Sequence, residues 1–325
     1  MNETIKKYIR IIDQELINLP FGRYPENLYD PIRYTLQLGG KRIRPLLALL
    51  AYGLYHENPI RILKPALAVE VFHNFTLLHD DIMDNAPLRR GKPTVHNQWN
   101  ENTAILSGDV MLVRVYDLWL EVDPDLLQRI IKEFNDCAAQ VCEGQQLDMD
   151  YESKAVITED EYLQMIKFKT AVLIGFSLLS GGILARADET DNQLLYDFGI
   201  NLGIGFQLMD DQLDVYADHE KFGKQVGGDI ITNKKTFLLI KALELSKGKD
   251  REELRKWIRM KQFNAESKIN AVKNIYDQYR IKELTSEKIN QYFRTAHRDL
   301  DKISVPEGRK DHLRTLTEYL MNREI

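Results

Sequence analysis

Two acidic clusters in this sequence have residue types and spacings that could bind metal ions. Each has the pattern Asp-Asp-x-x-Asp and directly follows an apolar run. Their carboxylates belong to Asp80, Asp81, Asp84, Asp210, Asp211 and Asp214. Residues four apart lie on one face of a helix, so the first and last aspartates of each cluster project together. Because like charges at this spacing weaken a helix, both clusters predict bound divalent cations, which prefer carboxylate oxygen.

The residues around the clusters favour Mg²⁺ over other divalent metals. No histidine stands one turn from either cluster on the same face, and His79 is adjacent to Asp80. This disfavours a zinc or di-iron site, which commonly uses histidine ligands. Mg²⁺ keeps several waters and usually bridges carboxylates to substrate phosphates. A solvated acidic surface is the ordinary interpretation of one such cluster, but two clusters beside apolar runs favour a metal site in the core of a helical bundle.

Basic side chains form three groups around the clusters. In chain order the groups are Gly39-Gly40-Lys41-Arg42-Ile43-Arg44-Pro45, Arg89-Arg90-Gly91-Lys92, and Lys224 with Lys234 and Lys235. Arginine pairs bidentately with phosphate and lysine adds a point charge. A solvated surface patch would explain any one group. Three groups ordered around two metal-binding clusters instead predict a diphosphate substrate.

The elements that must position these residues are helices. Apolar residues recur with helical period along almost the whole chain, and no convincing strand alternation is present. We expect helices over residues 5–19, 28–38, 45–55, 65–84, 101–121, 125–148, 170–185 and 189–215, and charged amphipathic helices from 235 onward. Thr158 and Glu161 have the spacing of a capping box that opens another helix. Polar segments at 85–93 and 221–234 are expected to be loops, and the simplest account is one all-α domain over residues 1–325.

Composition sets the class of protein. The hydrophobic content of 44% and charged content of 29% are ordinary for a soluble globular protein. A net charge of −5 argues against a general nucleic-acid binder. We see no secretion signal at the N-terminus, and the apolar stretch 170–185 is shorter than the roughly 20 residues of a transmembrane helix, so we expect a buried helix there. The two cysteines match no disulfide or metal framework, which suits a reducing cytoplasm.

The ordered set of motifs resembles the trans-isoprenyl diphosphate synthases, the head-to-tail prenyltransferases of the polyprenyl synthetase family. The resemblance covers nearly the whole chain from Gly39 to Lys235. Besides the two acidic clusters and the first two basic groups, the matching motifs are Gly144-Gln145, Lys169-Thr170, Gln207, and Gly223-Lys224-x-x-Gly227-x-Asp229. It implies a helical bundle of the isoprenoid synthase type with a central acidic cavity, a requirement for Mg²⁺, and a homodimer.

The resemblance also implies roles for individual residues. Mg²⁺ on the allylic diphosphate would be held by Asp80, Asp84 and Asp210, with Asp81, Asp211 and Asp214 in support. The same diphosphate would contact Arg89, Lys169, Lys224 and Lys234. Isopentenyl diphosphate would bind Lys41, Arg44, His73 and Arg90. The developing allylic cation would meet the oxygens of Thr170 and Gln207. From its position alone, two turns before Asp80, His73 could equally be a core histidine.

The implied reaction needs no strong general base. Metal ions and basic side chains stabilise the departing diphosphate, and the allylic cation then alkylates isopentenyl diphosphate. Phe75, five residues before Asp80, would form the floor under the growing chain, while its neighbour Thr76 is small. In the family that the chain resembles, one aromatic and one small residue at these positions imply a C20 product, geranylgeranyl diphosphate, with C15 farnesyl diphosphate next. The alternative is that Phe75 is an ordinary core residue. A synthase of longer chains, a terpene cyclase or other lyase, and a non-catalytic subunit of a heteromeric synthase are the alternatives.

Overall fold

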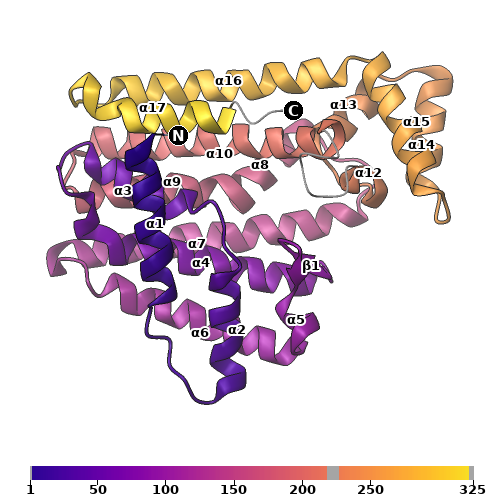
Figure 1. The fold of residues 1–325 in the computed structure, drawn as a ribbon. Helices are drawn as coiled ribbons and strands as arrows, with labels where there is room; N and C mark the ends of the chain where they lie inside the picture. Colours follow the sequence, from indigo (N-terminus) through magenta and orange to yellow (C-terminus); the bar gives the residue numbers. More distant parts are fainter. Residues whose placement is uncertain (1, 218–226, 322–325) are drawn as a thin grey trace. The chain divides into compact units, whose positions relative to one another are not determined.

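The computed structural model describes residues 2–217 and 227–321, and almost all of them are helical (Figure 1). In chain order the elements are α1 (Glu3–Ile17), α2 (Glu26–Gln37), α3 (Ile43–Gly53), η1 (Pro59–Ile62), α4 (Leu63–Met83), β1 (Leu88–Arg89), β2 (Lys92–Pro93), α5 (Val95–Gln98), α6 (Glu101–Trp119), α7 (Pro124–Ser153), α8 (Glu159–Ile166), η2 (Lys167–Ala171), α9 (Val172–Leu184), α10 (Glu189–Tyr216), α12 (Gly228–Thr232), α13 (Phe237–Leu245), α14 (Gly248–Arg259), α15 (Ala265–Gln278), α16 (Ile281–Lys302) and α17 (Glu307–Met321). The all-α class predicted from the sequence is therefore confirmed.

Local sequence signals set several helix boundaries. Thr158 accepts a hydrogen bond from the Glu161 amide, and Glu161 in turn accepts one from the Thr158 amide, so the predicted capping box at the start of α8 is confirmed. Asn2 and Asn100 cap α1 and α6 in the same side-chain-to-backbone manner. Each such cap satisfies an amide that would otherwise lack a partner and contributes about 1 kcal/mol. These caps start helices close to where the apolar periodicity starts.

One short segment differs from the expected loop at residues 85–93. Strands β1 and β2 pair there as an antiparallel hairpin, with Leu88 opposite Pro93 and Arg89 opposite Lys92. Arg90 and Gly91 form the two-residue turn, with φ of 54° and 75°. Positive φ at both turn residues matches the twist of a tight hairpin, and glycine adopts it without steric cost. Two-residue strands are too short to carry an alternation pattern, so they could not be predicted from periodicity.

The described helices group into two compact units. The first contains Met1–Cys137, Leu173–Tyr196 and Asp301–Leu316, and the second contains Ala138–Val172, Asp197–Leu300 and Thr317–Ile325. The single domain expected over residues 1–325 stays a prediction.

In the first unit, α4 packs against α3 and α6, and α2 packs against α6 (Figure 1). Aromatic side chains fill the space between these helices and the neighbouring α7 and α9. Phe134 stacks edge-on against Phe72 at 5.1 Å between ring centroids, and Trp119 does so against Phe176 at 5.7 Å. All four are 1% exposed or less, and burying each contributes about 1.5–3 kcal/mol. This core fixes α4, the helix that ends in the first acidic cluster.

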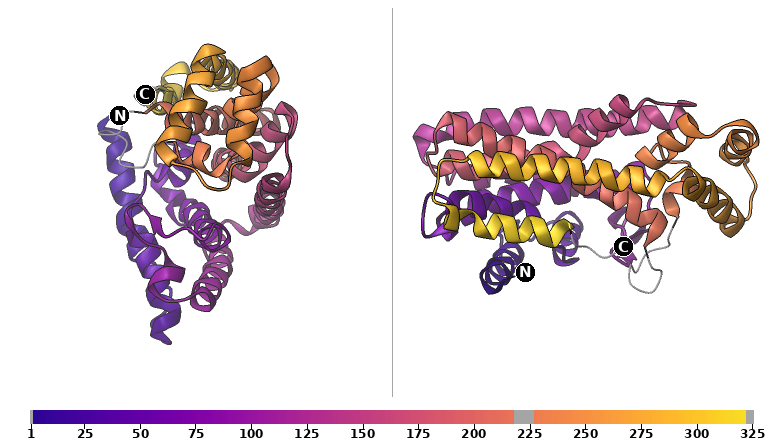
Figure 2. Two further views of the ribbon diagram at one scale, coloured as in Figure 1. Left: turned by 90° about the vertical axis from the view of Figure 1, so that its right-hand side faces the viewer. Right: turned by 90° about the horizontal axis from the view of Figure 1, so that it is seen from above.

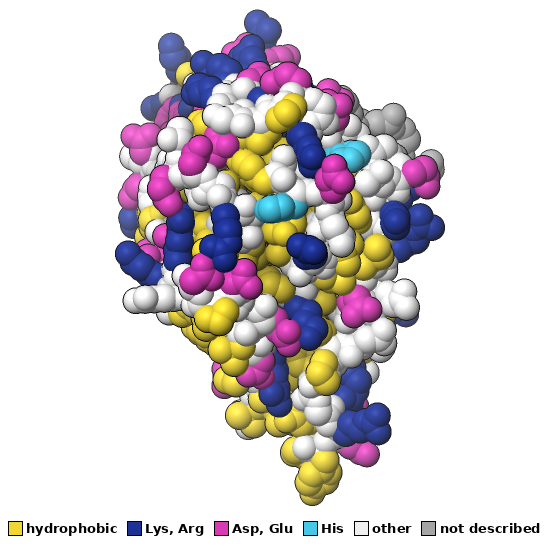
Figure 3. Space-filling model, turned by 90° about the vertical axis from the view of Figure 1, so that its left-hand side faces the viewer, with side chains coloured by type: hydrophobic (Ala, Val, Ile, Leu, Met, Phe, Trp, Pro, Cys, Tyr) yellow, Lys and Arg dark blue, Asp and Glu magenta, His cyan; other side chains and the backbone are white. Residues whose placement is uncertain are grey.

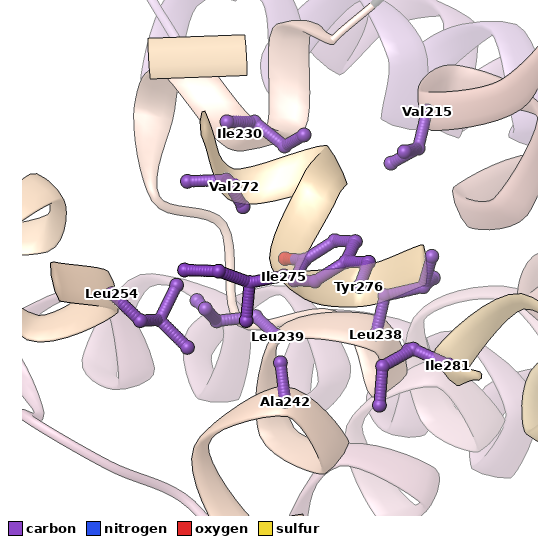
Figure 4. Packing of buried hydrophobic residues seen from close by; sticks show 10 residues of the cluster. All are labelled: Val215, Ile230, Leu238, Leu239, Ala242, Leu254, Val272, Ile275, Tyr276 and Ile281. Carbon is purple, nitrogen blue, oxygen red and sulfur yellow. The ribbon is translucent and has the colours of Figure 1, made fainter. Parts of the chain in front are cut away.

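The second unit has its own apolar cluster around α15. Leu238, Leu239, Val272, Ile275 and Tyr276 are buried together there with residues of α10, α12 and α14 (Figure 4). Helices α14 and α15 lie side by side, as both views of Figure 2 show. Because Val215 of α10 and Ile230 of α12 belong to this cluster, it holds the end of α10 that carries the second acidic cluster.

Helical residues 159–184 are the one stretch, in residues 2–217 and 227–321, that is long and apolar enough to cross a membrane. In its most apolar window, 78% of the residues are buried inside the protein. Residues 171–183 are buried without interruption, as expected for a core helix that is apolar all round. On the face drawn in Figure 3, acidic and basic side chains are interspersed with apolar ones. That face lacks the single-sign charge expected of a surface that binds nucleic acid.

Candidate active site

The first acidic cluster lies at the C-terminal end of α4. The amide of Asp84 donates to the Asp80 carbonyl as the helix ends, so these two side chains lie one turn apart. Asp80 is half-buried and Asp84 is exposed, whereas Asp81 is 5% exposed. The cluster therefore separates into an outer pair, Asp80 and Asp84, and a buried middle carboxylate.

Arg89 of the hairpin holds the middle carboxylate. Its Nε donates to Asp81 Oδ1 at 2.9 Å and Oδ2 at 2.8 Å, and a terminal nitrogen lies 2.7 Å from Oδ1. The same guanidinium lies 3.6 Å from Asp80 Oδ2. Burial raises the pKa of Asp81, and the pairing with Arg89 opposes that rise. Arg89, predicted to bind diphosphate, thus sits beside a carboxylate predicted to bind metal.

The residues predicted to bind isopentenyl diphosphate belong to the same unit. Lys41 is exposed in the loop before α3, Arg44 is half-buried in the first turn of α3, and His73 is half-buried on α4. Burial lowers the pKa of His73 well below its usual range, and the positive charges of Arg44 and Arg90 lower it further. These charges place the imidazole in a positive field, which favours a bound anion.

Arg90 joins the hairpin to the loop before α3. Its guanidinium donates to the Gly39 carbonyl. A Cβ on Gly40, which has φ of 147°, would lie 3.0 Å from an Arg90 nitrogen, so glycine leaves the room that the guanidinium occupies. The structure therefore brings together four predicted residues, because Arg44, His73, Arg89 and Arg90 interact electrostatically.

Phe75 and Thr76 lie on α4, N-terminal to the first cluster. The Phe75 ring is half-buried and packs 5.6 Å from Phe72 and 4.8 Å from His79, measured between ring centroids. Thr76 turns its hydroxyl back to the His73 carbonyl at 2.8 Å. The neighbours of Phe75 are thus aromatic, and the polar group of Thr76 is satisfied within its own helix.

The second cluster repeats the arrangement of the first. On α10, Asp210 and Asp214 are half-buried, one turn apart, whereas Asp211 is 4% exposed. Tyr162 Oη of α8 donates to Asp211 Oδ2 at 2.6 Å, and Gln207 Nε2 donates to Asp211 Oδ1 at 2.9 Å. Burial and the nearby charge of Asp229 raise the pKa of Asp211. Again the middle carboxylate is held by donors, while the outer pair is half-exposed.

Lys169 and Thr170 lie in η2, a π-helical turn between α8 and α9. Lys169 Nζ is 2.5 Å from Asp148 Oδ2, and Thr170 Oγ1 donates to Gln207 Oε1 at 3.0 Å. Gly144 of α7 faces this turn, where a Cβ would overlap the Lys169 amide and lie 2.6 Å from the Lys169 Cα. The sequence predicts an ordinary helix from residue 170, whereas the structure has a π-turn over Lys167–Ala171. A π-turn marks functional sites in many helices and here brings Thr170 to Gln207.

The segment that follows the second cluster is hydrogen-bonded to it. The Asp229 amide donates to Asp214 Oδ2 at 2.9 Å, and Lys234 Nζ lies 3.9 Å from Asp229 Oδ1. Lys268 of α15 is 1% exposed and donates to the Ile231 carbonyl at 3.0 Å and to Asn233 Oδ1 at 2.7 Å. It thereby fixes the left-handed turn before Lys234. Lys224 lies outside the described residues.

Two contributors to the site, Tyr162 and Lys268, were not singled out from the sequence, and Asp229 appeared there only within a motif, without a role. Tyr162 sits on the apolar face of α8 and looks like core packing. Lys268 lies in a charged helix where it looks like a surface residue. Only Asp229 had a signal, because it stands in the motif with Gly227, and a role for it could have been inferred there.

The donor atoms suit Mg²⁺ that binds together with a substrate. Across the part of the chain that the structure describes, no three or more His, Cys, Asp or Glu side chains are gathered into a metal cage. Each cluster instead has two outer carboxylates at half-exposed or exposed positions. Mg²⁺ is typically bound by one or two carboxylates, waters and substrate phosphates. The residues present therefore fit that ion, with substrate oxygens completing the coordination.

Comparisons with known proteins show which family this chain is similar to. The model of the family "Polyprenyl synthetase" matches residues 25–276. A geranylgeranyl pyrophosphate synthase from Geoglobus acetivorans is 34% identical over 100% of this chain and 99% of its own. A crystal structure of a geranylgeranyl pyrophosphate synthase superposes with a TM-score of 0.93 at 42% identity, covering 100% of both chains. A farnesyl diphosphate synthase from Bacillus subtilis is 38% identical over 69% of this chain and 79% of its own.

The chain belongs to the polyprenyl synthetase family, and it is a prenyltransferase enzyme.

Proposed function

We propose that the protein is a Mg²⁺-dependent synthase that condenses isopentenyl diphosphate with an allylic diphosphate and releases a trans C20 product, geranylgeranyl diphosphate. The observation that carries the proposal is the arrangement shared by both acidic clusters. In each, the middle aspartate is held by protein donors and the outer two carboxylates remain at half-exposed or exposed positions. Basic side chains for a diphosphate accompany each cluster.

The outer carboxylates and the basic side chains bind the allylic diphosphate. Asp80 and Asp84, with Asp210 and Asp214, would hold Mg²⁺, and Arg89, Lys169, Lys224 and Lys234 would contact the diphosphate. When bound, Mg²⁺ supplies positive charge that stabilises the leaving diphosphate. Asp81 and Asp211 act by holding Arg89 and Gln207 in place.

The reaction begins when the allylic C1–O bond breaks and the diphosphate leaves with the electron pair. The oxygens of Thr170 and Gln207 stabilise the positive charge that develops at the allylic carbons. The hydroxyl proton of Thr170 is directed to Gln207 Oε1, so the lone pairs of Thr170 Oγ1 point elsewhere. This local geometry supports the role for Thr170.

The second substrate is bound by Lys41, Arg44, His73 and Arg90. Its double bond attacks the allylic C1, a new carbon–carbon bond forms, and a proton leaves the adjacent carbon to restore a double bond. The released diphosphate accepts this proton, so no side-chain base is required. A neutral His73, as its lowered pKa implies, donates one hydrogen bond to the isopentenyl diphosphate.

The sizes of the Phe75 and Thr76 side chains support a C20 product. Phe75 is half-buried against two other rings and forms the floor, and Thr76 leaves room beside it. The names of the geranylgeranyl-forming relatives agree with this length. A C15 product, farnesyl diphosphate, is the second candidate, because the Bacillus subtilis relative is named a farnesyl diphosphate synthase.

The assembly we propose is a homodimer in the cytoplasm. Leu106, Val113 and Leu120 follow one another at seven-residue spacing along α6 and its C-cap, and they are 57%, 62% and 67% exposed. Such a stripe on one helix face is suited to packing against a second copy of itself. Both cysteines are free thiols, which agrees with a reducing compartment.

Mass spectrometry of the products tests this function. Purified protein is incubated with Mg²⁺, isopentenyl diphosphate and each allylic primer in turn. One dominant C20 diphosphate is the expected result, and a ladder reaching C30 or beyond would discard the Phe75 floor. No elongation with any primer would move the assignment to a cyclase or to a subunit that needs a different partner.

A further inference from the structure

The loop between α2 and α3 holds a buried arginine for which no role has yet been given. Arg42 is the N-cap residue of α3, with φ of 49°, and its side chain is 1% exposed. A left-handed conformation is uncommon for a residue with a long side chain and persists only when surrounding contacts impose it. Arg42 also makes no side-chain cap hydrogen bond to α3. Its conformation is therefore set by contacts elsewhere.

Those contacts come from three different helices. Arg42 Nε donates to Asp13 Oδ1 of α1, one terminal nitrogen donates to Glu70 Oε1 of α4, and the other donates to the Leu36 carbonyl near the end of α2. All three distances are 2.8 Å. The planar guanidinium presents donors in a fixed fork, so three good bonds define both the position and the orientation of this side chain.

The network continues toward the candidate substrate site. Glu70 is 3% exposed and also accepts a hydrogen bond from Asn74 Nδ2 at 3.2 Å. His73 follows Glu70 by three residues on α4, so the two lie on adjacent turns of one helix face. On the other side, Arg90 donates to the Gly39 carbonyl of the same loop. Hydrogen bonds therefore hold the short segment from Gly39 to Arg42 at both ends.

Lys41 and Arg44 flank this fixed point in the chain. The exposed Lys41 directly precedes Arg42, and the half-buried Arg44 follows two residues later. A flexible loop would have to order these two cations each time an anion binds, which costs conformational entropy. A loop held by three hydrogen bonds to three helices has already lost that freedom.

We propose that Arg42 is a positioning residue for the second substrate: it fixes the backbone between Lys41 and Arg44, and through Glu70 the turn that carries His73, so that the isopentenyl diphosphate site is ordered before the substrate arrives. The proposal rests on the proposed function. It assigns no contact between Arg42 and the substrate, because its three donor directions are used by protein acceptors.

Kinetics with both substrates distinguish positioning from a purely structural role. In Arg42→Lys the charge remains, but one ammonium cannot reproduce the three fixed directions. We expect KM for isopentenyl diphosphate to rise about tenfold or more, in line with the sensitivity of bound geometry to small displacements, and KM for the allylic primer to stay within about twofold. An equal rise of both KM values, or no change in either, would overturn the proposal.

A matched control is available elsewhere in the first unit. Lys310 is also a buried cation, 1% exposed, with Nζ donating to the Asp301 carbonyl at 2.7 Å and to Glu307 Oε1 at 2.9 Å. Lys310→Met removes this buried cation and its hydrogen bonds, so it should lower the melting temperature. It should leave both KM values unchanged. If it raises KM for isopentenyl diphosphate as Arg42→Lys does, the effect is general destabilisation and the proposal fails.

A second variant covers the case in which single replacements fold poorly. Arg42→Gln alone leaves Glu70 buried without its charged partner, which destabilises the fold, whereas Arg42→Gln with Glu70→Gln removes both charges. The double variant should melt above the single variant and still show the raised KM for isopentenyl diphosphate. Recovery of both stability and KM in the double variant would overturn the proposal.

Direct binding separates this proposal from the proposed function. Isothermal titration with isopentenyl thiolodiphosphate, a non-reacting analogue, should give at least about tenfold weaker binding to Arg42→Lys than to wild type. If wild type binds the analogue but forms no product with any primer, the proposed function fails while the positioning role is still measured. Equal binding by wild type and Arg42→Lys overturns the positioning role even where wild type is fully active.

Discussion

Tyr162 Oη lies 2.6 Å from Asp211 Oδ2, and both side chains are buried. The phenol donates to the middle carboxylate of the second cluster in the same way that Arg89 donates to that of the first. A neutral donor serves Asp211, whereas a cation serves Asp81. The two clusters share a sequence pattern, but their middle aspartates are held by different chemistry.

Removing the Tyr162 hydroxyl should weaken the second cluster. In Tyr162→Phe the buried Asp211 carboxylate keeps its bond from Gln207 but loses the one from Tyr162, which should lower the free energy of unfolding by about 1.5–3 kcal/mol in urea titration. Because Gln207 shares Asp211, we also expect kcat to fall about tenfold or more, measured by product formation at saturating Mg²⁺. Tyr55→Phe is the control, since Tyr55 Oη donates to Asp191 Oδ2 at 2.8 Å in the other unit. That variant should lose stability but keep kcat, and an equal loss of kcat in both would contradict the prediction.

A side chain at position 144 should displace the π-turn. In Gly144→Ala the new Cβ overlaps the Lys169 backbone, so η2 must move and carry Lys169 and Thr170 with it. We expect kcat to fall about 100-fold while circular dichroism keeps the helical content. Gly308→Ala is the control, because nothing lies within 4 Å of a Cβ there. Wild-type turnover by Gly144→Ala would mean that the turn is not part of the catalytic site.

Product length should respond to the size of residue 75. Phe75→Ala removes the proposed floor and should shift the dominant product from C20 to longer chains, read by mass spectrometry. Phe75→Leu should give an intermediate shift, and Phe75→Tyr, which keeps the ring, should leave the length unchanged. Thr76→Phe adds a second aromatic and should shorten the product toward C15. An unchanged distribution of product lengths in Phe75→Ala would contradict the hypothesis that Phe75 limits chain length.

His73 should make the protein less stable in mild acid. Its pKa is depressed in the folded state, mainly by burial and then by the charges of Arg44 and Arg90, so below pH 6.5 the unfolded chain binds a proton that the folded protein does not. Stability is therefore full above pH 6.5 and falls as the pH drops toward the folded pKa, by up to about 1.4 kcal/mol per unit.

Comparison with a variant isolates this contribution. His73→Gln cannot titrate, so the difference in unfolding free energy between wild type and variant, measured in urea, should change in favour of the variant from pH 7 to pH 5.5 by about 1 kcal/mol. The raised pKa values of Asp81 and Asp211 act in the opposite direction but are common to both proteins. A difference that is constant over this range would show that His73 does not titrate differently on folding.

The oligomeric state should depend on α6. Val113→Glu places a charge in the middle of the exposed apolar stripe and should convert the proposed dimer to monomer in sedimentation velocity experiments. Val156→Glu makes the same change at a valine that is 58% exposed and belongs to the other unit, so it should leave the mass unchanged. A dimer that survives Val113→Glu, or a wild-type monomer, would reject this surface as the interface.

The sequence predicted the parts of this protein that depend on local periodicity. The helices that carry the two acidic clusters, the loop before α3 and the capping box of Thr158 all follow from spacing and capping preferences. Pairings between distant residues do not. Tyr162 and Asp211 are 49 residues apart, and Lys268 is 35 residues from Asn233, so no spacing rule connects either pair. The π-turn at Lys169 was also missed, because five residues are too few to show a period that differs from the α-helix.

The β1–β2 hairpin links the two proposed substrate sites through adjacent residues. Arg89 reaches Asp81 of the acidic cluster, and Arg90, the next residue, reaches the Gly39 carbonyl of the loop before α3. Inserting one residue between Asn85 and Leu88 would shift the register of both arginines at once, since each would move to its neighbour's place. The connection from Asp84 to Thr94 therefore has a fixed length, although surface loops generally tolerate insertions. In directed evolution or loop grafting, this segment should accept side-chain changes far more readily than changes in its number of residues.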